Sequence, residues 1–200
     1  MDLSGGTLNA TLDEVVIAYH QGKTGTDTGT LTFDGGAVTA NTLTVGWATA
    51  DGNGQARALG TLNVNGGSFA TGTARVGVGS GRATGTMRVD GGSFEADSLV
   101  LGEGATSTEQ GDGTAEGTLT VADGSVQING NVDLGTGTAG STGTIHTNGG
   151  TLSIAGNVVG GIGSSAVHAD GGTVTVGGDL RVDALRVGYQ GKTASLSVSG

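Results

Sequence analysis

Residues 29–46 read GTLTFDGGAVTANTLTVG, and this stretch decides the fold. Apolar side chains stand at every second position on both sides of the glycine pair, as in Leu31 and Phe33 before it and Val38 after it. Alternation with period two is typical of a β-strand with one buried face, whereas an amphipathic helix has a period of about 3.6. Asp34 followed by glycine is typical of a turn, because both residue types tolerate positive φ. The stretch therefore predicts strands joined by a tight corner.

The same pattern recurs along the whole chain. Residues 85–102 (GTMRVDGGSFEADSLVLG) and 117–135 (GTLTVADGSVQINGNVDLG) are its clearest relatives. Each copy is marked by a Gly-Gly or Gly-Ser step after a short alternating run. The first glycine of successive markers stands at Gly5, Gly35, Gly66, Gly91, Gly124, Gly149, Gly171 and Gly200. The period varies from 22 residues (149 to 171) to 33 residues (91 to 124). A fixed marker with an elastic period predicts stacked structural repeats.

Each repeat contains three strand pieces, and three pieces predict a triangular cross-section. The first piece places its inward side chains at Leu31, Phe33, Leu62, Val64, Met87, Val89, Leu119 and Val121. The second places them at Val38, Ala40, Phe94, Ala96, Val126, Ile128, Leu152, Ile154, Val174 and Val176. The third places them at Val15, Ile17, Leu43, Val45, Leu99, Leu101, Val132, Leu134, Leu185 and Val187. Phe69 and Phe94 fall at the same position of successive repeats, so their rings are expected to stack in the core.

The third piece usually ends in glycine, and a return segment of variable length follows it. Residues 47–59 and 103–117 are long return segments, and residues 78–84 and 136–142 are short ones. We expect these segments to be loops at one corner, because loop closure free energy grows slowly with length. Trp47, Tyr19 and Tyr189 stand where such segments begin, and loops on a rigid scaffold commonly carry binding. These three residues are the predicted binding residues.

Composition limits the function classes. The chain has 44 glycines, no proline, no cysteine, an apolar fraction of 34% and a net charge of −10. Proline cannot donate to a β-ladder, so its absence suits a chain built of interior strands. Eight Lys and Arg against eighteen Asp and Glu argue against nucleic acid or an anionic membrane as partner. No apolar run of about 18 residues or basic leader is present, which predicts no membrane insertion by this segment.

No catalytic, cofactor-binding or metal-binding residues are predicted. The QGKT strings at 21–24 and 190–193 lack the upstream glycine of a phosphate-binding loop. The column Asp34, Asn65, Asp90, Asp123, Asn148 and Asp170 is explained as turn residues, with calcium binding as the alternative. His146 and His168 are expected on adjacent repeats, with no nucleophile beside them. Arg75, Asp133, Arg181 and Arg186 are expected on the third strand pieces without forming a cluster, and the sequence predicts a protein that is not an enzyme.

Outward threonines also align. They stand at Thr30, Thr61, Thr86, Thr118 and Thr144, whereas a second column with Thr32 and Thr120 is interrupted by Asn63, Arg88, His146 and Ser197. A flat threonine ladder is typical of ice-binding proteins, although a threonine-rich exposed strand is also ordinary β-propensity. Ice binding therefore stays an alternative function.

The units at 29–46, 85–102 and 117–135 resemble the passenger repeats of bacterial autotransporters and related surface adhesins, and the similarity covers nearly all 200 residues. The resemblance implies a right-handed parallel β-helix, or β-solenoid, of about seven three-stranded triangular coils. It also implies an extracellular or bacterial cell-surface location. It transfers no catalytic residues.

The sequence thus predicts one domain over residues 1–200, either a segment of a longer chain or a stacking subunit. Its predicted function is that of a non-catalytic structural or adhesive scaffold. Exposed β edges are templates for pairing, so end-to-end self-association into fibres is expected. Surface glycans or a host or cell-surface protein are the other expected partners. A carbohydrate-active or glycan-binding protein is the alternative in a different class.

Overall fold

The computed structural model describes residues 2–3, 6–105 and 113–200, which form fifteen strands. The strands are β1 (Asp2–Leu3), β2 (Leu8–Phe33), β3 (Gly36–Val64), β4 (Ser68–Gly79), β5 (Arg82–Val89), β6 (Ser93–Gly104), β7 (Ala115–Val121), β8 (Ser125–Ile128), β9 (Val132–Thr136), β10 (Thr142–Ile154), β11 (Val158–Gly160), β12 (Ser164–Val176), β13 (Leu180–Arg181), β14 (Ala184–Val187) and β15 (Ala194–Val198). No helix in the described part of the chain is long and apolar enough to cross a membrane.

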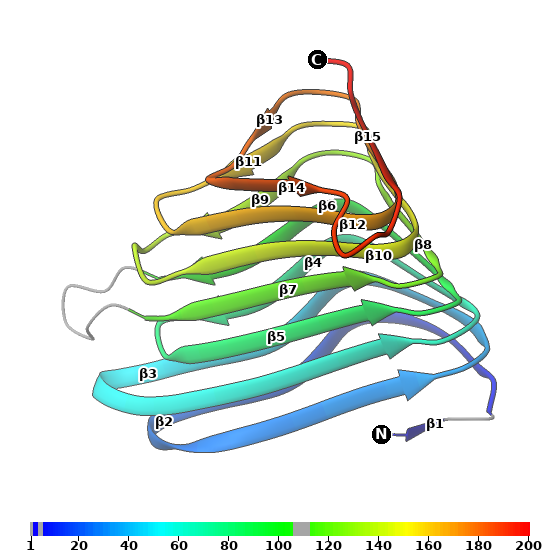
Figure 1. Cartoon of the computed structure of the whole chain (residues 1–200). Coiled ribbons are helices and arrows are strands. Elements are labelled where there is room, and N and C mark those ends of the chain that lie inside the picture. The colour runs from blue at the N-terminus through cyan, green and yellow to red at the C-terminus, as the bar shows by residue number, and fades with distance from the viewer. Residues whose placement is uncertain (1, 4–5, 106–112) are drawn as a thin grey trace.

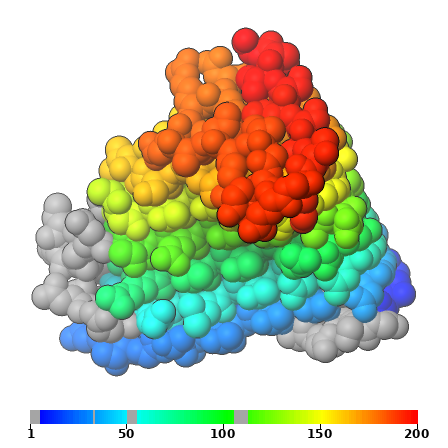
Figure 2. All heavy atoms as spheres, viewed as in Figure 1, coloured from blue at the N-terminus to red at the C-terminus, as the bar shows by residue number. Residues whose placement is uncertain are grey.

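The strand pairs of the described residues are all parallel, and paired residues lie about one sequence repeat apart. One inward column runs through Leu31, Leu62, Met87, Leu119, Ile145 and Val167. The predicted alignment of equivalent residues is confirmed. Figure 1 shows β2, β3, β5, β7, β10, β12 and β14 stacked in this order from the bottom upward, and Figure 2 shows the molecule narrowing toward its C-terminal end.

The predicted right-handed β-helix of triangular, three-stranded coils is wrong. The strands form a closed parallel β-barrel with further strands outside the ring, rather than a β-solenoid. The pairing closes because β3 pairs with both β4 and β5, and β10 pairs with both β7 and β8. β2 and β3 are 26 and 29 residues long and run through positions expected to be corners. Local alternation predicted the strands but not their joining into one sheet.

The long return segment at 47–59 is also not a loop. It belongs to β3, and its backbone pairs with β2, β4 and β5. Residues 106–112 of the other long segment lie outside the described residues. Pairing on both sides of a register shift explains the difference, because Ala48 and Ala50 pair with β2 before the shift and Ala56 and Ala58 pair with β2 after it.

In the final repeat, the sequence predicted the wrong residues for the third strand piece. Leu185 and Val187 lie in β14, where they pair with Val167 and Ala169 of β12. The third piece there is β13, whose Leu180 pairs with Val158. The segments around Leu180 and Leu185 carry similar alternation, so local pattern alone cannot choose between them.

A column of inward glycines brings two parts of the sheet into backbone contact. The column consists of Gly29, Gly60, Gly85, Gly117 and Gly143. A methyl group on Gly85 would collide with the carbonyl oxygen of Val45, the amide nitrogen of Gly77 and, at 2.7 Å, Cγ1 of Val76. Gly77 itself has φ of 70°, a left-handed conformation that favours glycine. Beyond this contact lies a small separate cluster of buried alanines, Ala48, Ala58, Ala83 and Ala115.

The main core fills the barrel with aliphatic side chains and two phenylalanines. Phe69 and Phe94 pair across β4 and β6, and each side chain is 1% exposed. Their ring centroids lie 5.9 Å apart with an interplanar angle of 27°. The predicted stacking of these rings is confirmed.

Thr147 is a polar exception in the core. It occupies an inward position between Val121 and Ala169, it is 1% exposed, and its Oγ1 has no hydrogen-bond partner. A buried hydroxyl without a partner is destabilising because it has lost its hydrogen bonds to water.

We expect Thr147→Val to raise the free energy of unfolding by about 1 kcal/mol, because it replaces the orphaned hydroxyl with a methyl group of similar shape. Urea unfolding followed by circular dichroism measures this as a higher midpoint at unchanged slope. Thr144→Val on the outward face of β10 is the matched control and should change stability by less than about 0.5 kcal/mol. Equal effects of the two substitutions would contradict the explanation.

Candidate functional site

Tyr19 and Trp47 form an aromatic pair on the outside of the barrel. They are register partners on β2 and β3, with ring centroids 4.8 Å apart and tilted by 52°. Tyr19 is 43% exposed, and its hydroxyl donates a 3.0 Å hydrogen bond to Oε1 of Gln21. The structure therefore brings two of the three predicted binding residues together.

Trp47 borders a cleft of about 130 Å³ on the same side. The cleft is lined by Glu14, Thr42, Thr44, Trp47, Thr73, Arg75 and Val78. Nε and Nη2 of Arg75 donate to Oε2 of Glu103 at 3.0 and 2.5 Å, so the guanidinium is held in place. Asp133 lies in the same outward column as Arg75, two strands further along the sheet. Burial and the nearby Glu103 raise the pKa of Asp133. The cleft thus combines an aromatic face with hydroxyl groups and an oriented ion pair.

Tyr189 lies elsewhere. It follows β14 rather than a third strand piece, and the guanidinium carbon of Arg186 stands 4.4 Å from its ring centroid. The prediction that Tyr189 shares a binding edge with Trp47 followed from the wrong placement of Leu185 and Val187 in the sequence. Tyr189 packs against a cation instead.

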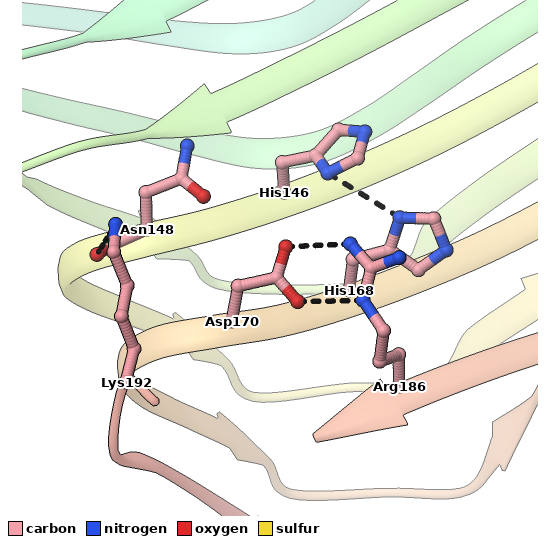
Figure 3. A network of polar contacts seen from close by, with 6 residues as sticks. All are labelled: His146, Asn148, His168, Asp170, Arg186 and Lys192. Atoms are coloured by element: carbon pink, nitrogen blue, oxygen red, sulfur yellow. Dashed lines mark hydrogen bonds and ion pairs between the residues drawn. The ribbon is translucent and has the colours of Figure 1, made fainter. Parts of the chain in front are cut away.

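A second polar cluster covers the outer face of β10, β12 and β14 (Figure 3). His146 and His168 are register partners on β10 and β12, as expected from the sequence, and their Nδ1 atoms lie 3.3 Å apart. Nε and Nη2 of Arg186 donate to Oδ1 and Oδ2 of Asp170, both at 2.6 Å. Lys192 Nζ donates to the backbone carbonyl of Asn148 at 3.5 Å.

Burial and mutual interactions set the charges of this cluster. Burial, and next the neighbouring His168, lower the pKa of His146. Burial, and next the positive Arg186, lower the pKa of His168. The hydrogen bonds from Arg186 lower the pKa of Asp170, and those to Asp170 raise the pKa of Arg186. Both imidazoles therefore stay neutral further into the acidic range than an exposed histidine.

Three of the four charged residues predicted on the third strand pieces lie there, and the fourth lies on another strand. Arg75, Asp133 and Arg181 share one outward column, whereas Arg186 belongs to β14 and pairs with His168. The sequence reading missed the ion pair between Arg186 and Asp170, because it placed Arg186 on the wrong strand. The alternation ALRV directly before Gly188 was the misleading signal.

The turn residues at the glycine markers make local contacts. Nδ2 of Asn65 donates to Oδ1 of Asp34 at 2.9 Å, and Arg88 donates to both carboxylate oxygens of Asp90. Within the described residues no group of three or more His, Asp or Glu side chains is placed to hold a metal ion. Glu109 and Asp112 of the return segment 103–117 lie outside the described residues.

The threonine ladder is present as a column. Thr30, Thr61, Thr86, Thr118 and Thr144 are register partners, and the column continues with Ala166. The neighbouring column contains Asn63, Arg88, His146 and His168 between its threonines, so no flat two-column array forms. Ser197 lies outside that column, on β15 opposite Thr175.

A scan against protein-family models and searches of curated proteins and solved structures found no match to this chain. The resemblance to autotransporter passengers and adhesins therefore stays a prediction.

Proposed function

We propose that this chain is a rigid, non-catalytic adhesive scaffold whose Trp47 cleft contacts the sugar rings of a surface glycan. The observation that carries the proposal is the aromatic pair Tyr19 and Trp47 beside the threonine hydroxyls and the Arg75–Glu103 ion pair. Aromatic faces pack on the apolar C–H surfaces of sugar rings, and the polar groups supply directed hydrogen bonds.

The size of the cleft determines the kind of contact. Its volume of about 130 Å³ is well below the roughly 300–1,000 Å³ of sites that enclose a small molecule. A contact with one ring of a longer polymer fits this volume. Such contacts are individually weak, and adhesion would depend on several of them acting together.

The single tryptophan gives a direct test, because Trp47 is the only residue of its kind in the chain. Titration with soluble neutral oligosaccharides should change Trp47 fluorescence in a saturable manner. Trp47→Ala should weaken binding to a glycan array at least about tenfold, a loss typical of an aromatic hot spot. Trp47→Phe keeps an aromatic face and should lose less.

Tyr189→Ala is the control, because Tyr189 is an exposed aromatic residue that does not line the cleft. Its binding should equal that of the unmodified protein. Glycan binding that leaves Trp47 fluorescence unchanged, or that survives Trp47→Ala intact, would refute this site. Absence of binding across a broad glycan panel would refute the function.

End-to-end self-association stays a prediction alongside this proposal. Leu185, Val187 and Val198 are 51%, 46% and 45% exposed at the C-terminal end of the barrel. At the N-terminal end, a hollow of about 290 Å³ is bordered by Val15, Ile17 and Leu31. The extracellular or bacterial cell-surface location is likewise a prediction.

A further inference from the structure

We propose that His146 and His168 together bind one divalent transition-metal ion of the Zn²⁺ or Cu²⁺ class. The pair lies on the outer face of β10 and β12, and neither histidine lines the Trp47 cleft, so the inference is independent of the proposed glycan contact. The sequence predicted no ligand for either histidine.

The backbone fixes the two side chains in place. His146 and His168 are directly opposite one another in a parallel ladder, and the flanking pairs Ile145–Val167 and Thr147–Ala169 are in register and face inward. Those four side chains are buried, which leaves the strands little freedom to slide or separate. The two imidazoles are therefore presented together before any ligand arrives.

The separation of the ring nitrogens matches a shared ion. Nδ1 of His146 and Nδ1 of His168 lie 3.3 Å apart. Zinc–nitrogen bonds are about 2.0–2.1 Å long, so two nitrogens on one tetrahedral ion stand about 3.3 Å apart. The same distance also allows a hydrogen bond between the two Nδ1 atoms when no ion is bound.

Both rings have a lone pair to offer near neutral pH. An imidazole is largely neutral near pH 7, so neither ring needs to lose an acidic proton when the ion binds. In the pair without metal, one Nδ1 carries a hydrogen and the other accepts it. On binding, that hydrogen moves to Nε2 of the same ring, so no proton is released and no oxidation occurs.

Asp170 and Arg186 determine how tightly the ion is held. Asp170 stands two residues after His168 on the same face of β12, but both its oxygens accept hydrogen bonds from Arg186. The described residues contain no three-ligand group, so the ion would have two protein ligands, with water completing its coordination. Cu²⁺ should bind more tightly than Zn²⁺, following the usual order for nitrogen ligands.

The test is calorimetric titration of Zn²⁺ and Cu²⁺ into untagged protein in a buffer that does not bind metal. We expect one ion per chain. His146→Thr and His168→Thr should each weaken binding at least about tenfold, because each removes one of two ligands. Threonine suits these positions, since Thr120 occupies the equivalent place next to His146 on β7. Cu²⁺-loaded protein should show an electron paramagnetic resonance spectrum with two nitrogen ligands.

Two further variants sharpen the test. His20→Gln is the control, because His20 contacts Asp27 and Thr24 on β2 and should leave binding unchanged. Arg186→Gln removes a positive charge and releases Asp170, so it should tighten binding several-fold. Circular dichroism of each variant establishes that it is folded. Unchanged affinity in folded His146→Thr/His168→Thr protein, or weaker binding in folded Arg186→Gln protein, would overturn the proposal.

Discussion

Gly85→Ala should lower the free energy of unfolding by about 3 kcal/mol or more. The added carbon would overlap the carbonyl oxygen of Val45 and the amide nitrogen of Gly77. These are backbone atoms held in parallel ladders on both sides, so they cannot move aside as a flexible side chain can. Urea unfolding followed by circular dichroism measures the loss.

Gly35→Ala is the matched control for this prediction. A methyl group there would lie 3.6 Å from the carbonyl oxygen of Gly6 and 3.7 Å from Oγ1 of Thr7, which are ordinary contacts. Its stability should stay within about 0.5 kcal/mol of the unmodified protein or rise slightly, because alanine restricts the unfolded chain. A similar loss in both variants would mean that glycine flexibility, rather than the close approach, explains Gly85.

Phe94→Ala should lower the free energy of unfolding by about 3–5 kcal/mol. Phe94 is 1% exposed, and its ring stacks on that of Phe69 at a centroid distance of 5.9 Å. The substitution removes apolar contacts and leaves a cavity, because the ladders around it resist collapse. Phe94→Leu keeps most of the volume and should lose much less stability.

A double-mutant cycle isolates the contact between the rings. Phe69→Ala alone should also be strongly destabilising, since Phe69 is equally buried. The double variant should lose less than the sum of the two single losses, with a coupling of about 0.5–1.5 kcal/mol for the aromatic pair. Strict additivity would show that the rings contribute through burial alone.

Much of the strand alignment could be predicted from the sequence. The glycine marker set the repeat, and period-two alternation identified which residues face inward. These rules placed Phe69 opposite Phe94 and put His146 and His168 on adjacent repeats, as the structure confirms. Both signals are local, because turn chemistry and pleat geometry depend on neighbouring residues.

The candidate sites were predicted less well. Tyr19 and Trp47 were identified because they stand where return segments begin, and the structure places them in contact. Tyr189 was grouped with them because Leu185 and Val187 imitate a third strand piece. The choice between that placement and the observed pairing with Val167 and Ala169 depends on non-local contacts.

The sequence by itself determined the all-β class, the elastic repeat and the inward and outward faces of most strands. Only the tertiary structure decided that the strands join into a closed parallel barrel and that glycines line one contact. At the position equivalent to Gly143, β12 carries Ser165, whose Oγ donates a 2.8 Å hydrogen bond to Oδ2 of Asp183. The allowed side chain there depends on how closely a segment distant in sequence approaches, and no local pattern encodes that distance.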